Sequence, residues 1–192
     1  MMTTDTTHTP DTPAITFAET RGAVKGYEKK AVDAFLARAR GAFEYGGAPM
    51  TSAEVRQVAF PLVRRGYSIG AVDAALGRIE DAFAAREREL AVTSGGVHAW
   101  VGQTRETAQA VLDRLSRPKG HRFDRVGALR YGYRIDEVDM VSDKLARYLE
   151  TGESISVEQV RAVAFRMQRG GYRESQVDAV LDAVIEVMLA VK

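Results

Sequence analysis

The sequence predicts an all-α fold of four helix–turn–helix repeats in two duplicated pairs, with short coiled-coil-like pairing of helices. Two observations predict it: one motif occurs four times, and apolar residues between its copies recur at helical spacing. The composition agrees with a packed globular protein, because the 192 residues are 45% apolar and 28% charged. No segment shows the apolar–polar alternation typical of a half-buried strand.

The repeated motif is Gly-Tyr-x-x-x-x-Val-Asp. Its first and third copies lie 106 residues apart (Tyr27 to Tyr133), and its second and fourth copies lie 105 apart (Tyr67 to Tyr172). These matched spacings indicate that a unit of two repeats was duplicated. The motif residues, copy by copy, are Gly26, Tyr27, Val32 and Asp33; Gly66, Tyr67, Val72 and Asp73; Gly132, Tyr133, Val138 and Asp139; and Gly171, Tyr172, Val177 and Asp178.

Each copy is interpreted as a helix, a tight turn and a second helix. Capping-box pairs at Thr51 with Glu54 and at Ser156 with Gln159 predict where a helix begins before the second and fourth copies. The motif glycine then stands where a left-handed residue would end that helix. After each tyrosine, apolar residues at steps of three and four predict a longer amphipathic helix.

Composition and motif spacing together predict how the chain divides into a tail, two pairs of repeats and a linking helix. Residues 1–14 are rich in Thr and Pro and predict a disordered tail. Residues 15–92 hold the first pair of repeats, 15–48 and 51–92. The dipeptide Gly95-Gly96 breaks the chain before a linking helix within residues 93–120, where Trp100 lies on an apolar stripe. Residues 121–192 hold the second pair, 121–152 and 154–192.

The residue inventory argues against catalysis. Without cysteine, disulfides and thiol nucleophiles are excluded, and three scattered histidines show no metal-ligand spacing. No phosphate-binding glycine-rich loop precedes a helix. We therefore expect a protein that is not an enzyme and holds no cofactor or metal. A net charge of +1 argues against nucleic-acid binding, and the absence of long apolar runs and of a signal sequence predicts a cytoplasmic protein.

The segment from Lys25 to Leu36, Lys-Gly-Tyr-x-x-x-x-Val-Asp-Ala-Phe-Leu, resembles the hallmark of the DivIVA N-terminal domain. The segment from Arg65 to Leu76 is similar, and Phe60 and Phe165 stand seven residues before a motif tyrosine, as in that family. The resemblance covers roughly residues 15–91 and 121–192. It implies a non-enzymatic adaptor or scaffold of bacterial cell division and polar growth, peripheral at the inner face of the membrane at septum or pole, which recruits protein partners such as a DivIVA-family scaffold.

The resemblance also implies a membrane or partner contact made by an apolar and basic loop near the glycine. The candidate contact residues are Phe17, Arg21 and Lys25; Phe60, Arg64 and Arg65; Arg122, Phe123 and Arg125; and Phe165, Arg166 and Arg169. Some family features are missing: Ser68, Arg134 and Arg173 stand where an acidic residue usually follows the tyrosine, and no long coiled coil follows. These differences favour a compact accessory protein, either a homodimer or a chain that pairs its own repeats.

Other interpretations stay open. The four phenylalanines could be core residues, the glycines could serve positive φ, the tyrosines could pack between helices, and the aspartates could complement a helix dipole. The alternative function is a compact soluble helical-repeat module that binds proteins without touching membrane. Nucleic-acid binding through Arg125, Arg130 and Arg134, or a ubiquitin-associated-like unit at residues 66–76, fits less of the pattern.

Overall fold

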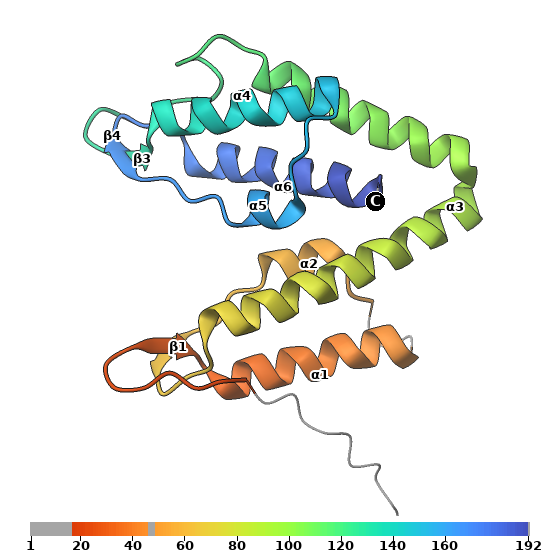
Figure 1. The fold of residues 1–192 in the computed structure, drawn as a ribbon, viewed down its shortest axis with the longest axis vertical. Coiled ribbons are helices and arrows are strands. Elements are labelled where there is room, and N and C mark those ends of the chain that lie inside the picture. Colours follow the sequence, from red (N-terminus) through yellow and green to blue (C-terminus); the bar gives the residue numbers. More distant parts are fainter. Residues whose placement is uncertain (1–16, 46–48, 192) are drawn as a thin grey trace, which may run out of the picture. The chain divides into compact units, whose positions relative to one another are not determined.

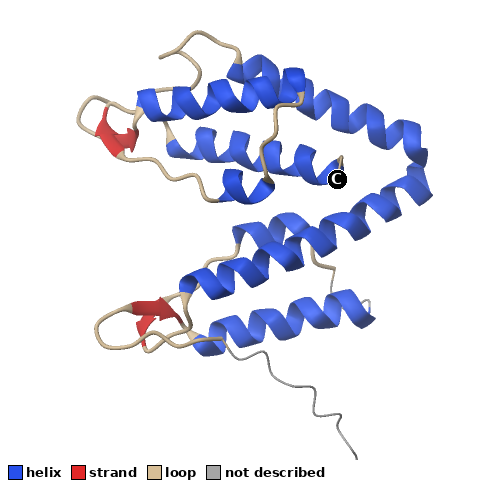
Figure 2. Ribbon diagram, viewed as in Figure 1, coloured by secondary structure: helices blue, strands red, loops and turns tan. Residues whose placement is uncertain are grey.

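The computed structural model describes residues 17–45 and 49–191, and helices dominate it (Figures 1 and 2). The predicted disordered tail, residues 1–14, lies outside the described residues. In chain order the elements are β1 (Lys25–Tyr27), α1 (Lys29–Tyr45), α2 (Ser52–Gln57), β2 (Leu62–Arg64), α3 (Ile69–Leu115), β3 (Tyr131–Tyr133), α4 (Ile135–Thr151), α5 (Val157–Arg161), β4 (Met167–Arg169) and α6 (Glu174–Ala190). The prediction of a mainly helical fold is confirmed.

The described residues form two compact units, which differ from the predicted division at residue 92. The first unit contains residues 17–45 and 57–76, and the second contains residues 49–56 and 77–191. Helix α3 begins in the first unit and continues in the second. Its first two turns bury Val72 and Ala75 in the core of the first unit, so the boundary falls inside a helix.

The capping boxes begin short helices, as predicted. At α5 the Ser156 side chain accepts a hydrogen bond from the Gln159 backbone N–H, and the Ser156 N–H donates to the Gln159 side chain (3.2 and 2.8 Å). Thr51 and Glu54 make the same pair of bonds at α2 (3.1 and 2.9 Å). Neither helix reaches its motif glycine, however, since α2 ends at Gln57 and α5 ends at Arg161.

Four short strands replace the predicted helix ends, which is a correction to the helix–turn–helix interpretation. Strand β1 pairs antiparallel with β2, with Lys25 opposite Arg64, and β3 pairs antiparallel with β4, with Tyr131 opposite Arg169. The backbone before each even motif therefore bonds to the preceding copy rather than to its own helix. Residues 17–24 and 121–130, before the odd motifs, form no helix either.

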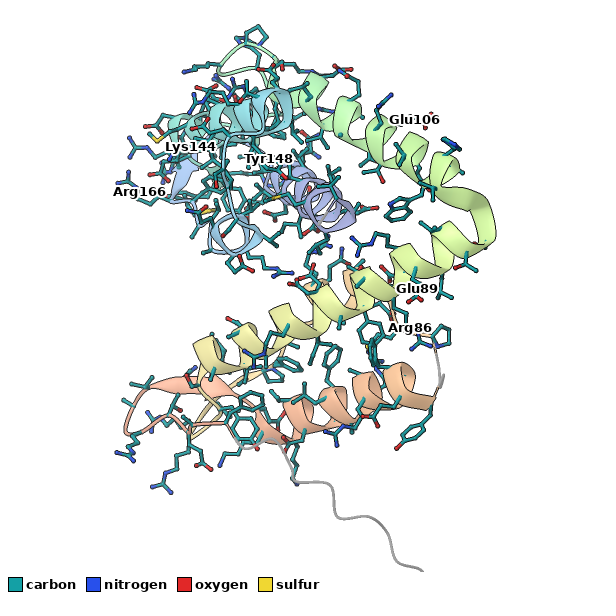
Figure 3. The ribbon with its side chains drawn as sticks, turned by 45° about the vertical axis from the view of Figure 1, so that its right-hand side comes forward. Arg86, Glu89, Glu106, Lys144, Tyr148 and Arg166 are labelled. Carbon is teal, nitrogen blue, oxygen red and sulfur yellow. The ribbon has the colours of Figure 1, made fainter. Side chains whose placement is uncertain are left out.

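Helix α3 joins what the sequence divided into a repeat helix and a separate linking helix. Inside it only Gly96 departs from helical geometry, with φ 80° and ψ 155°, a backbone conformation that glycine adopts readily. Helical structure resumes at once, so Arg86 and Glu89 precede the kink and Glu106 follows it (Figure 3). Trp100, beyond the kink, is half-buried.

The largest core lies in the second unit, where the end of α3 packs with α4, α5 and α6. Its buried residues are Val111, Leu115, Leu145, Val157, Val160, Val184, Ile185, Met188 and Leu189. Four of these residues, Val184, Ile185, Met188 and Leu189, lie at helical spacing on α6 and turn one face of that helix into the core. Among the described residues, no helix has an apolar stretch long enough to cross a lipid bilayer.

Candidate functional site

The four Gly-Tyr dipeptides meet in pairs. In the first unit, Tyr27 and Tyr67 exchange both backbone hydrogen bonds (3.0 and 2.8 Å). In the second unit, Tyr133 and Tyr172 do the same (both 2.9 Å). We call these contacts the first crossing (residues 26–27 with 66–67) and the second crossing (132–133 with 171–172). Each crossing joins an odd copy of the motif to the even copy that follows it.

Close backbone approach explains the motif glycines. A Cβ atom added at Gly26 or Gly66 would lie closer than 3.0 Å to the backbone carbonyl of the opposite tyrosine, and the same holds at Gly132 and Gly171. The expectation of positive φ at these glycines is wrong, because the left-handed glycines lie elsewhere. The motif therefore needs glycine for space at the crossing rather than for a helix cap.

Within each crossing, the tyrosine of one copy hydrogen-bonds the aspartate of the other copy. Tyr172 donates to the Asp139 carboxylate (3.0 Å), and Tyr67 donates more weakly to Asp33 (3.4 Å). The reciprocal bonds join Tyr27 to Asp73 and Tyr133 to Asp178. The tyrosine and the aspartate of the motif therefore bond between two copies, a pairing that the spacing within one copy does not predict.

The motif valines and the predicted contact phenylalanines form a small core beneath each crossing. Val32, Val72, Val138 and Val177 are all buried. Phe17 packs edge-on against Tyr67, and its counterpart Phe123 packs against Tyr172, both with ring centroids 5.3 Å apart. Phe60 contacts Tyr27 and Phe165 contacts Tyr133, at 5.3 and 5.1 Å. Again each ring packs on the tyrosine of the neighbouring copy.

This packing corrects the predicted contact site. Phe17 and Phe123 are buried, so their side chains are not exposed for contact, and Phe60 and Phe165 are partly buried against aromatic partners. Arg122 is also buried: its guanidinium donates to the Asp139 carbonyl (2.6 Å) and to the Asp143 carboxylate (2.5 Å). The neighbouring copy covers the phenylalanine rings, since each of the four packs against a tyrosine of that copy.

The other predicted contact residues remain on the surface, around loops that we call the first tip (residues 20–26 and 61–66) and the second tip (125–132 and 166–171). Arg21, Lys25, Arg64 and Arg65 are exposed on the first tip. On the second tip, exposed Arg125 donates to the Gly120 carbonyl (3.2 Å) and Arg169 lies over the Tyr131 ring. Arg166, labelled in Figure 3, forms an ion pair with Glu137.

Each tip also exposes apolar side chains that were not predicted. Val24 is 62% exposed on the first tip, and Leu129 is 85% exposed on the second. Both belong to a repeated tetrapeptide, Gly-Ala-Val-Lys at residues 22–25 and Gly-Ala-Leu-Arg at residues 127–130, which is the sequence signal that could have identified them. Leu62 and Met167 are exposed at equivalent places in β2 and β4.

The tips concentrate positive charge. Together they contain eight arginine and lysine residues and no acidic residue, whereas the whole chain has a net charge of only +1. The rest of the chain therefore carries a net charge of −7. One of these cations, Arg65, has a left-handed backbone (φ 55°), while the equivalent position of the second tip is Gly170 (φ 64°).

Burial raises the pKa of the crossing tyrosines. The pKa of Tyr133 rises to about 12, first because its hydroxyl is desolvated and then because the Asp178 carboxylate lies beside it and accepts its hydrogen bond. The same causes raise the pKa of Tyr27 and Tyr67. The pKa of Tyr172 is also raised, chiefly by burial.

Stability is therefore expected to fall as the pH rises from about 10 to about 12. In this window the unfolded chain has released the Tyr133 proton, whose ordinary pKa is 10.0, while the folded chain still holds it, so rising pH favours unfolding. Urea midpoints measured by circular dichroism between pH 9 and pH 12 would show the decline. In Tyr133→Phe the decline should be shallower; an equal slope in both proteins would contradict the assignment.

No group of three or more histidine, aspartate or glutamate residues in the described parts of the chain is arranged to hold a metal ion. Comparison with protein-family models, curated proteins and solved structures finds no match for this chain. The two tips, each held by a crossing, are the features that combine exposed apolar side chains with concentrated charge.

Proposed function

We propose that this chain is a non-enzymatic adaptor that attaches peripherally to an anionic membrane surface through its two tips. One observation carries the proposal: at each tip an exposed aliphatic side chain, Val24 or Leu129, stands among cations with no acidic residue in the tip. A cation near an anionic lipid surface contributes about 1 kcal/mol, and an aliphatic side chain adds to this when it enters the interface.

The crossings suit this role because they fix the two chain segments of each tip to one another. A tip is made of two chain segments that are fixed to one another by strand pairing and by the exchange of backbone bonds between tyrosines. Little conformational entropy is then lost when a tip binds. Each of the two units carries one tip.

The adaptor part of the proposal follows from the fourfold motif and its resemblance to DivIVA domains. We interpret the chain as four related repeats that pair two by two within one molecule, so that a single chain supplies both partners of each crossing. Localisation to the septum or the pole, and recruitment of a DivIVA-family scaffold, are proposed from the resemblance.

Charge reversal at the tips tests the membrane contact. In Lys25→Glu/Arg130→Glu, two attractive cations become repulsive, so binding to vesicles of phosphatidylglycerol and phosphatidylcholine should weaken by more than tenfold at low salt. Co-sedimentation measures the bound fraction. The control is Arg105→Glu/Lys144→Glu, which makes the same change in net charge at exposed sites outside the tips, on α3 and α4.

Equal losses in the tip and control variants would show that only net charge matters, and would contradict a site at the tips. Equal binding of the unaltered chain to pure phosphatidylcholine would contradict the electrostatic part. If the unaltered chain binds neither vesicle, the alternative of a protein-binding module without membrane contact replaces the proposal. Leu129→Ser, which keeps every charge, separates the contribution of the apolar side chain.

A further inference from the structure

Helix α3 keeps one apolar register through its kink. Residues at seven-residue intervals along it are Ile69, Leu76, Phe83, Leu90, Val97, Thr104 and Val111, six of them apolar. No residue is inserted or deleted in this register at Gly96, so the heptad pattern continues unbroken through the kink. The sequence is therefore compatible with a single straight helix over Ile69–Leu115, about 70 Å long.

Apolar side chains flank the kink without cover. Leu90, Val97 and Val101 are 59%, 57% and 47% exposed, although they follow one another at helical steps of seven and four. Exposed aliphatic residues at this spacing are typical of a helix face that meets another helix. Their position on both sides of Gly96 means that they would form one continuous face if the helix straightened.

A buried ion cluster joins the chain before the kink to the chain after it. Glu80, which is almost fully buried, binds Arg56 through one carboxylate oxygen and Arg161 through the other (both 2.6 Å). Arg161 also binds Asp81 (2.9 Å), and Arg56 donates to the Asp182 carbonyl (3.0 Å). Arg56 and Arg161 occupy equivalent positions of the duplication, in the sequence Val-Arg-x-Val-Ala-Phe.

A small residue and complementary charges allow the ion cluster to form. Gly77 leaves room for Arg161, since a Cβ there would come to 3.3 Å from its guanidinium. Two pairings cross the kink: Arg161, which follows Gly96, binds Glu80 and Asp81, and Arg56, which precedes it, binds Asp182. Any chain that presents residues 157–191 to Glu80 can make these bonds, and a second copy of this chain has the required residues.

We infer that the chain exchanges its C-terminal part with a second copy of itself. In this dimer α3 is straight at Gly96, and residues 97–191 of each chain bind residues 49–95 of the other through the same ion cluster. The two straight helices then run antiparallel past each other where they cross, which brings Leu90, Val97 and Val101 of both chains together. Exchange of an identical element is a low-cost route to dimers, because it reuses existing contacts. The inference does not depend on membrane binding.

Alanine at the kink tests this inference. Alanine disfavours the left-handed backbone of Gly96 but favours a straight helix, so Gly96→Ala should raise the dimer association constant roughly tenfold or more. Light scattering after size exclusion separates the monomer of 21.0 kDa from a particle of twice that mass. The matched control is Gly102→Ala on the same helix, where added Cβ meets open space. The unaltered chain should itself dimerise as its concentration rises.

Cross-linking identifies the contacts of the dimer, because the chain has no cysteine of its own. Asp81→Cys and Arg161→Cys are introduced separately, each together with Gly96→Ala, and the two proteins are mixed with a short thiol cross-linker. A covalent heterodimer supports the exchange. The double variant Asp81→Cys/Arg161→Cys in one chain with native Gly96 shows that the cross-linker spans this pair.

Three results overturn the inference. One is a Gly96→Ala protein that stays monomeric at every concentration. Another is a Gly102→Ala protein that dimerises as strongly as Gly96→Ala. The third is a Gly96→Ala dimer in which cysteines at positions 81 and 161 of different chains do not cross-link, since that dimer would use some other surface.

Discussion

Gly132→Ala is expected to destabilise the second unit by at least about 3 kcal/mol. The added methyl group would overlap the Tyr172 backbone carbonyl. This carbonyl accepts a hydrogen bond from the Tyr133 N–H, and the Tyr172 N–H donates to the Tyr133 carbonyl, so the backbone cannot rotate away as a side chain could. Overpacking in a core ordinarily costs about 1–3 kcal/mol, and contact with a fixed backbone lies at or above the upper end. Urea unfolding followed by circular dichroism measures the change.

Gly102→Ala is the control for this experiment, because Gly102 lies inside α3 with no atom near the place of the new Cβ. It should leave stability unchanged or raise it by up to about 1 kcal/mol through helix propensity. A Gly132→Ala protein as stable as Gly102→Ala would mean that the two backbones need not approach so closely. The motif glycine would then require another explanation.

Glu80→Ala is expected to cost about 3–5 kcal/mol, the range for removal of one member of a buried ion cluster. The substitution leaves the Arg56 and Arg161 guanidinium groups close together without the carboxylate that lies between them. Both arginines are largely shielded from water, so hydration of their guanidinium groups compensates for little of the lost interaction with Glu80. The midpoint and slope of urea unfolding give the free energy directly.

Glu89→Ala, at an exposed position on the same helix, removes the same charge and should change stability by less than about 0.5 kcal/mol. Glu80→Gln separates charge from size, because the amide keeps the volume and can still accept hydrogen bonds from one arginine. If Glu80→Ala matched Glu89→Ala, the cluster would contribute no net stability.

The sequence predicted those parts of the fold that depend on neighbours along the chain. The capping boxes at Thr51 and Ser156 satisfy backbone groups within one helical turn, so their spacing alone located two helix starts. The amphipathic helices after the tyrosines were predicted for the same reason. Strands β1 to β4 could not be predicted, because each has three residues, too few to show alternation, and pairs with a segment roughly 40 residues away.

The candidate site was only partly predictable because its contacts run between copies. Tyr172 with Asp139, and Phe17 with Tyr67, belong to different repeats, so each repeat taken alone suggested a different role for its residues. Most of the basic residues near the glycine do lie exposed on the tips. Which apolar residue is exposed depends on what the partner copy covers, and only the structure places Val24 and Leu129 outside and Phe17 and Phe123 inside.

The crossed motifs also constrain how the chain is made. In each pair, the valine, tyrosine and phenylalanine of the first copy pack in one core with residues of the second copy, about 40 residues later. The first copy therefore cannot fold when it first leaves the ribosome. The first unit needs only residues up to 76, whereas the second needs residues almost to the end of the described chain. Synthesis should therefore produce two separate folding events, the second of which waits until the residues of α6 have left the ribosome.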